Sequence, residues 1–246
     1  MNGFFYKMPR LIAAFLRHGE YQQLPGVPSA MQPFALNEKG LKQAYQVASN
    51  ILSDCQQMQA IIHSEINSSA LLRAWQTAQQ LRAGLLAELG KITSVEFSIN
   101  QSEKLTERSV GCVANLNITQ IENILTADPR YSCPPKNWKS DSYYSLPFQG
   151  AESLMDAGLR VAQFIAQKMQ QLKSRICQDT IMIFVGHGAA FRHAAYHLSV
   201  LEYEQIAQLS MFHAQPIYIE LKQQGQFQHI FGKWKVRNYQ QQQYID

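Results

Sequence analysis

Two segments of the sequence place a histidine just beyond an apolar run. Residues 11–16 lead into Arg17 and His18, and residues 181–185 lead into His187, which stands between two glycines. An apolar run that ends in polar residues is typical of a buried parallel strand whose carboxyl end opens into a loop. Because parallel strands end at the same edge of a sheet, we expect the two histidines to lie close together. A neutral imidazole there can act as a nucleophile.

Two arginines are expected at the same edge. Arg17 belongs to the same turn as His18, and Arg73 falls in the first turn of a helix that follows Ser68 and Ser69. Backbone N–H groups at such a helix start favour an anion, and the guanidinium fork matches pairs of phosphate oxygens. Arg73 alone would be a solvated helix residue, so the joint occurrence of these residues carries the prediction of a phosphate site.

Six blocks of the sequence also resemble the histidine phosphatase superfamily, or phosphoglycerate mutase-like family. They follow the family order over residues 11 to 221: Leu16 to Glu20, Ala35 to Ala44, Ser69 to Ala78, Leu105 to Arg108 with Gly111, Glu152 to Leu154 with Asp156, and Gly186 to Gly188 with Phe191 and Arg192. The resemblance implies an α/β fold, a three-layer α/β/α sandwich with a mostly parallel central sheet. Alternating strand and helix patterns agree with that class.

The resemblance also implies the roles of five residues. His18 is the nucleophile that takes the phosphoryl group, Arg17, Arg73 and His187 bind that group, and Glu107 is the proton donor. His187 counts among the catalytic residues as well. A ring of cationic donors offsets charge on the phosphoryl oxygens, and a carboxylic acid protonates the leaving alkoxide. Because this cationic pocket does the work of metal ions in other phosphoryl-transfer enzymes, we expect no metal and no other cofactor.

The general acid has two alternatives. Glu103 lies one helical turn from Glu107 in the sequence, and Glu20 adjoins the nucleophile turn. A general acid must reach the leaving oxygen by a hydrogen bond, which the sequence does not establish.

Departures from the family pattern favour a phosphomonoester hydrolase over a cofactor-dependent phosphoglycerate mutase-type phosphotransferase. Mutases usually follow the Arg-His-Gly turn with a Ser and then an Asn, whereas Tyr21, Gln22 and Gln23 stand here, and Arg130 is a single arginine where mutases carry a pair. A non-catalytic phosphate-binding interaction protein is the third interpretation. The presence of every expected site residue argues against it.

Two other motifs give weaker indications of a different function, namely dinucleotide binding and zinc binding. The Gly186 to Gly188 segment is half of a dinucleotide fingerprint, but Phe191 replaces the third glycine, which disfavours a Rossmann oxidoreductase. His193 and His197 have the spacing of a zinc pair without its glutamate, so satisfied core or surface histidines are the better interpretation.

We expect residues 1–246 to form a single domain with an insertion or lid around 115–148. The expected helices and strands have these ranges: helices from Asn37 through Ile51, 70–89, 152–172 and from 190; strands 11–16, 61–62, 95–99, 181–185, 217–221 and 227–231. The loops 21–33 and 115–145 would select the substrate. Five aromatic residues in or just beyond the second loop suit an apolar or aromatic leaving group: Tyr131, Trp138, Tyr143, Tyr144 and Phe148.

Composition limits the partners. The net charge of +4 comes from scattered rather than clustered lysines and arginines, which favours a small phosphorylated substrate over nucleic acid. No apolar stretch is long enough to span a bilayer, and four widely spaced cysteines suggest reduced thiols, so we expect a cytoplasmic protein with no membrane partner. An exposed strand at 217–221 would allow a homodimer.

Overall fold

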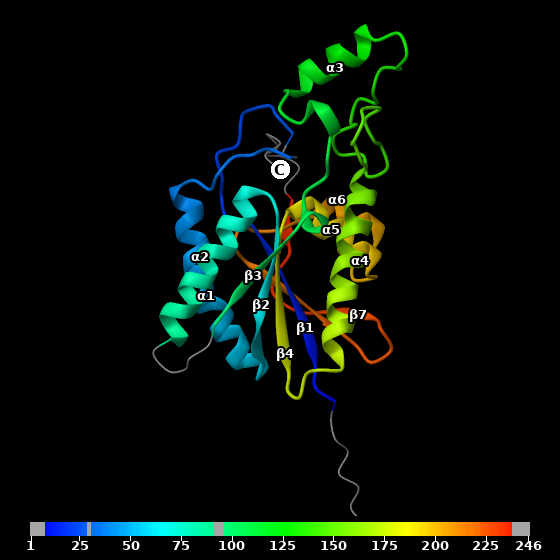
Figure 1. Cartoon of the computed structure of the whole chain (residues 1–246). Coiled ribbons are helices and arrows are strands. Elements are labelled where there is room, and N and C mark those ends of the chain that lie inside the picture. The colour runs from blue at the N-terminus through cyan, green and yellow to red at the C-terminus, as the bar shows by residue number, and fades with distance from the viewer. Residues whose placement is uncertain (1–7, 29–30, 91–95, 238–246) are drawn as a thin grey trace, which may run out of the picture.

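A six-stranded sheet forms the centre of the computed structural model, which describes residues 8–28, 31–90 and 96–237 (Figure 1). Its spatial order is β3-β2-β4-β1-β6-β7. The first four of these strands are parallel, whereas β6 is antiparallel to both β1 and β7. The strand bounds are β1 (Leu11–Arg17), β2 (Ile61–Ser69), β3 (Ser98–Ser102), β4 (Thr180–Gly186), β6 (Pro216–Leu221) and β7 (Phe227–Phe231). This arrangement confirms the predicted mostly parallel sheet.

Helices cover both faces of the sheet, which confirms the three-layer sandwich. One face carries α1 (Glu38–Met58) and α2 (Leu72–Leu89), and the other carries α4 (Leu154–Lys173) and α5 (Gly188–His197). The buried strand β1 shows why two layers form: Ile12, Ala14 and Leu16 pack on the α1 side, and the alternate residues pack on the α4 side. Two short elements, α6 (Tyr203–Gln208) and the β5 (Leu209–Ser210) to β8 (Lys235–Val236) pair, complete this half of the molecule.

The turn that carries His18 packs against the first turn of α1 through two glycines. Asn37 caps the helix, since its side chain accepts a hydrogen bond from the Gly40 backbone N–H at 2.8 Å. A Cβ at Gly40 would lie 1.8 Å from the Glu20 carbonyl oxygen, and one at Gly19 would lie 2.5 Å from the Gly40 carbonyl oxygen. Neither position therefore has room for a side chain, and the close approach fixes the turn that carries His18.

Several element boundaries differ from the sequence expectations. The strand expected at 95–99 is β3, displaced to Ser98–Ser102 because its pairing with Glu65 to Ser69 of β2 sets the register; Val95 lies outside the described residues. The helix expected from residue 70 begins at Leu72, because the Ser69 hydroxyl accepts the Leu71 N–H and holds the preceding residues outside the helix.

The strand expected at 217–221 is confirmed, but the expectation that it is exposed and free to pair across a homodimer is wrong. This segment is β6, which is buried and bonded to β1 on one side and β7 on the other. Its backbone groups are therefore used within the sheet, and the edge strands of this sheet are β3 and β7. A homodimer formed by pairing of β6 is excluded.

The segment around 115–148 lies beyond the edge where the parallel strands end (Figure 1). It contains a helix that the sequence expectation left unassigned, α3 (Ile118–Ala127), which opens with a capping box between Asn117 and Gln120. A small hydrophobic cluster holds it together: Val110, Val113, Ile121, Leu125, Trp138 and Leu146. Trp138 is 1% exposed and donates its indole N–H to Glu122, so it belongs to this core and not to a substrate surface.

The cysteines and the helix lengths can be compared with the sequence expectations of reduced thiols and no membrane span. All four cysteines are free thiols. None of the described helices combines the length and the apolar character that crossing a bilayer would take.

Candidate active site

His18 and His187 meet at the carboxyl edge of the sheet, as the sequence predicts. Their ring centroids are 5.1 Å apart, because each histidine directly follows one of two adjacent parallel strands, β1 and β4. The His18 backbone N–H continues the ladder by donating to the Gly186 carbonyl at 3.0 Å. Arg73 completes the cluster, with its Nε 3.2 Å from His18 Nε2.

The His18 ring is held in its neutral state. Its Nδ1 lies 2.7 Å from the Gly19 carbonyl oxygen, so Nδ1 carries the proton and donates it. Nε2 then keeps its lone pair, toward which the Arg73 Nε–H points. Burial holds the pKa of His18 well below its usual value, and the charges of Arg73, His187 and Arg17 lower it further against the opposing Gly19 hydrogen bond. The imidazole is therefore unprotonated near neutral pH.

Arg73 is 1% exposed and fixed on three sides. Besides contacting His18, it donates from Nη1 to the Gln32 carbonyl at 3.0 Å, and its guanidinium carbon lies 4.7 Å from the centroid of the Tyr21 ring. The same ring meets His18 edge-on at 5.2 Å. Tyr21 thus belongs to the cluster of His18 and Arg73, a contact that the sequence did not predict.

Arg17 lies beside the start of α5. Its Nη1 donates to the Met211 carbonyl at 2.9 Å, and a Cβ at Gly188 would approach its Cδ and Nε to 3.3 Å. The charge of Arg17 contributes to lowering the pKa values of both His18 and His187. The predicted second cation therefore lies next to the two histidines, and Gly188 leaves room for its side chain.

His187 is fully buried at the N-cap position of α5. Its Nε2 is 2.8 Å from the Ser69 hydroxyl, which itself accepts the Leu71 N–H at 3.2 Å. The Ser69 hydroxyl can donate to His187 Nε2 or accept from it, according to the tautomer of the ring. Nδ1 is buried and has no hydrogen-bond partner within the described chain. Desolvation by burial, followed by the charges of Arg73 and Arg17, keeps the pKa of His187 well below its usual value.

Glu107 is buried at the edge of this cluster. Its Oε1 accepts the backbone N–H groups of Arg108 at 3.0 Å and Ala190 at 3.1 Å, and Ala190 belongs to the first turn of α5. The Glu107 charge partly offsets the effect of burial, which lowers the pKa of Arg73. One carboxylate oxygen is therefore anchored, close to the cation that contacts the nucleophile.

The alternative acids lie elsewhere. Glu103 is exposed on the short turn Glu103–Leu105. Glu20 is bound through Oε1 to the Asn37 amide at 3.0 Å and through Oε2 to the Lys39 ammonium at 2.7 Å. The Lys39 and Asn37 hydrogen bonds lower the pKa of Glu20. Of the three carboxylates, Glu107 is the one that is buried and that interacts electrostatically with Arg73.

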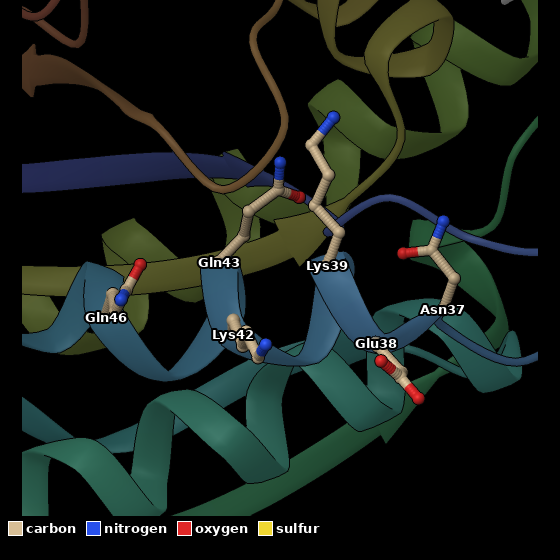
Figure 2. A pocket seen from close by; sticks show the side chains of 6 residues that line it. All are labelled: Asn37, Glu38, Lys39, Lys42, Gln43 and Gln46. Carbon is tan, nitrogen blue, oxygen red and sulfur yellow. The ribbon is translucent and has the colours of Figure 1, made fainter.

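A separate pocket of about 650 Å³ opens on the outer side of the α1 start (Figure 2). Six polar residues line it: Asn37, Glu38, Lys39, Lys42, Gln43 and Gln46. Lys39 and Gln43 point to one side of the helix in Figure 2 and both bind Glu20, since the Gln43 side-chain oxygen accepts the Glu20 N–H at 2.9 Å. The pocket therefore adjoins the nucleophile turn but shares no lining residue with the described histidine and arginine cluster.

The predicted interpretation of His193 and His197 is confirmed. Both His193 ring nitrogens are engaged, Nδ1 with the Ala189 carbonyl at 2.8 Å and Nε2 with the Ser142 hydroxyl at 3.1 Å. His197 Nε2 bonds to the Met155 carbonyl at 3.1 Å. These histidines join the segment at Ser142 to α4 and α5.

Two buried imidazoles and a buried guanidinium at the carboxyl edge of a parallel sheet form a site that fits a tetrahedral oxyanion, which is the requirement of phosphoryl-transfer enzymes. Residues 13–231 match the family model of the histidine phosphatase superfamily (branch 1). The chain belongs to this superfamily, which confirms the family indicated by the sequence blocks.

Solved structures share the fold over nearly the full length. An α-ribazole phosphatase from Shigella flexneri has a TM-score of 0.63 and 18% identity, covering 96% of this chain and 100% of its own. A mycobacterial glucosyl-3-phosphoglycerate phosphatase in complex with VO3 has a TM-score of 0.60 and 20% identity, with coverages of 93% and 98%. A phosphoserine phosphatase from Entamoeba histolytica in complex with 3-phosphoglyceric acid has a TM-score of 0.57 and 18% identity, covering 94% of this chain and 98% of its own. No curated protein matches the sequence.

Proposed function

We propose that this chain hydrolyses phosphomonoesters through a phosphohistidine intermediate on His18. The observation that carries the proposal is the neutral His18 ring, whose Nε2 lone pair lies 3.2 Å from Arg73 Nε beside a second buried histidine. Family membership and the named phosphatases that share the fold support the same reaction class.

The residues of the site divide the reaction into two displacements. Arg17, Arg73 and His187 hold the phosphoryl oxygens, and His18 Nε2 attacks phosphorus as the ester P–O bond breaks. Glu107 gives its proton to the leaving alkoxide. The resulting carboxylate then takes a proton from water, whose oxygen attacks the phosphohistidine, and inorganic phosphate and neutral His18 are regenerated. The buried cations stabilise the transferring group most strongly because water is excluded around them.

Hydrolysis is favoured over mutase chemistry by the surroundings of two residues. Tyr21 occupies the pocket wall beside Arg73, where its ring offers no phosphate-binding amide. Arg130 is paired with Asp128 at 2.6 Å on an exposed loop, so the single arginine of the insertion is already engaged by an acid. A mutase must bind and reorient a second anionic group, and these residues give little support for that.

The proposal extends to the organisation of the chain. We expect a single domain in which residues 115–148 act as a lid, because the Ile118 N–H donates to the Gly26 carbonyl at 3.1 Å and so joins the insertion to the loop 21–33. The expected partner is a small phosphorylated substrate and not nucleic acid. A cytoplasmic location agrees with four free thiols.

Phosphate release from 4-nitrophenyl phosphate tests the reaction. The native chain should release phosphate equally with and without a chelator, and His18→Ala should release none above background. Rapid quenching should trap an acid-labile, base-stable phosphoryl adduct on His18. The matched control is His63→Ala, a half-buried histidine in the amino-terminal half of β2, which should keep native activity. Equal background-level release by the native chain and His18→Ala would instead support a non-catalytic phosphate-binding protein.

A further inference from the structure

A third histidine lies against the nucleophile. The ring centroid of His213 is 5.7 Å from that of His18, with the planes inclined by 40°. At this separation the two rings are neighbours. His213 is half-buried, whereas His18 and His187 are 3% and 0% exposed, so its ring lies between the closed phosphate cluster and the solvent.

The loop that carries His213 is fixed on both sides. The Met211 carbonyl accepts a hydrogen bond from Arg17 Nη1 at 2.9 Å, and the Ala214 N–H donates to the Arg17 carbonyl at 2.9 Å. Ala214 has φ of +47°, a left-handed conformation that a residue with a side chain rarely adopts. Such strain persists where surrounding contacts impose it, and it concentrates at functional sites. The loop therefore presents the imidazole at a defined place.

The electrostatic setting of His213 suits an acidic or hydroxylated group. The carboxylate of Glu20 is near enough to interact with it: the pKa of Glu20 is lowered chiefly by its Lys39 and Asn37 hydrogen bonds and also by the charge of His213. Both Glu20 oxygens already accept hydrogen bonds, from Asn37 and Lys39. Because the half-buried His213 ring lies beside His18, the leaving alcohol of a substrate bound at His18 and Arg73 can contact it.

We infer that His213 is a specificity-determining residue, which donates a ring N–H to an acceptor oxygen on the leaving alcohol beyond the ester oxygen, a carboxylate oxygen above all. The inference rests on the proposed function, because it takes the phosphoryl group to be bound by Arg17, Arg73 and His187. The His213 contact is made to the leaving alcohol and not to the phosphoryl group.

Two phosphonates of matched size test the inference without turnover, since their C–P bond is not hydrolysed. 3-Phosphonopropanoate carries a carboxylate where propylphosphonate carries a methyl group. We expect the native chain to bind the carboxylate compound at least tenfold more tightly by calorimetry. His213→Phe, which keeps an aromatic ring against His18 but removes the N–H, should reduce this ratio to about one and leave the Kd of propylphosphonate within threefold of native.

His213→Gln retains an N–H donor and should keep an intermediate preference, while His63→Phe should match the native chain. A native chain without the preference, or His213→Phe with an unchanged ratio, would overturn the inference. Equal weakening of both phosphonates would show that His213 acts only by packing against His18. These Kd values remain measurable if phosphate release from aryl phosphates fails, so failure of the proposed reaction is distinguishable from failure of the His213 contact.

Discussion

The guanidinium carbon of Arg73 lies 4.7 Å from the centroid of the Tyr21 ring, so the main cation of the candidate site rests on an aromatic face. A cation–π contact of this kind, largely removed from solvent, is worth about 2 kcal/mol. The ring also meets His18 edge-on. One side chain therefore contacts both His18 and Arg73.

Replacing Tyr21 by Leu should lower kcat/KM for 4-nitrophenyl phosphate by about tenfold or more, because the guanidinium loses the ring that orients it. Tyr21→Phe keeps the ring face and should stay within threefold of the native chain. Steady-state kinetics of the two variants make the comparison. If Tyr21→Phe loses as much as Tyr21→Leu, the hydroxyl group and not the ring face would be the important feature.

Arg73→Ala should lower kcat/KM by about 10²–10³-fold, the range seen when one preorganised donor to the transition state is lost. The side chain is fully buried beside His18, so its removal also leaves a void, and circular dichroism must first establish that the variant folds. The exposed Arg130→Ala, whose partner is Asp128, provides the matched control and should keep native rates. A loss below about tenfold for Arg73→Ala would place that residue outside the phosphate pocket.

Substitution of Glu107 by Gln should slow an alkyl phosphate far more than 4-nitrophenyl phosphate, because nitrophenolate leaves without a proton. We expect a loss of about 10²–10⁴ for the alkyl ester, the usual contribution of general acid catalysis. The control variants Glu103→Gln and Glu20→Gln test the other two carboxylates. If Glu103→Gln or Glu20→Gln slowed the alkyl phosphate selectively and Glu107→Gln did not, the role of acid would pass to that other carboxylate.

Stability should fall as the pH is lowered from 7.5 to 5. The folded-state pKa values of His18 and His187 are well below the ordinary 6.5, and that of His193 is lowered to about 4, chiefly through burial. Below pH 6.5 these histidines are protonated in the unfolded chain but stay neutral in the folded chain. The free energy of unfolding that they contribute above pH 6.5 is therefore lost as the pH falls. Each of these histidines should remove about 2 kcal/mol by pH 5.

Urea unfolding at pH 7.5, 6 and 5 measures this loss of free energy. The pKa values of Glu20 and Asp128 are also lowered, but their unfolded values lie near 4, below this pH range. His193→Gln removes one of the three groups and should flatten the pH dependence by about a third. A free energy of unfolding that stays constant from pH 7.5 to 5 would contradict the buried neutral histidines.

The sheet and the histidine pair could be predicted because both follow from local patterns. Apolar runs that end in Arg17 and in His187 identify parallel strands, and parallel strands share an edge. The segment that contains α3 was harder, although Asn117 and the apolar residues at 118, 121 and 125 carry a helix signal, because its proline-rich surroundings obscured it.

The contacts of Tyr21, Ser69 and His213 could not be predicted, since they join segments far apart in the chain. Tyr21 contacts Arg73 in a helix that begins at Leu72, and Ser69 at the end of β2 contacts His187, which follows the neighbouring strand β4. A partial signal existed for His213: it precedes the strand that runs antiparallel to β1, and such a strand begins where its parallel neighbours end. Its closeness to His18 still depends on the hydrogen bonds of Arg17.

The reversed direction of β6 has a consequence for engineering the enzyme. Because β6 enters the sheet at the edge where β1 leaves it, the short loop from Met211 to Ala214 can be redesigned without altering any strand of the six-stranded sheet. A library confined to positions 212 and 213 would vary the approach to the nucleophile, while the Met211 and Ala214 backbone bonds to Arg17 keep the loop in place. Substrate selectivity could then be changed at positions 212 and 213, while the residues at the strand ends that form the reactive cluster stay as they are.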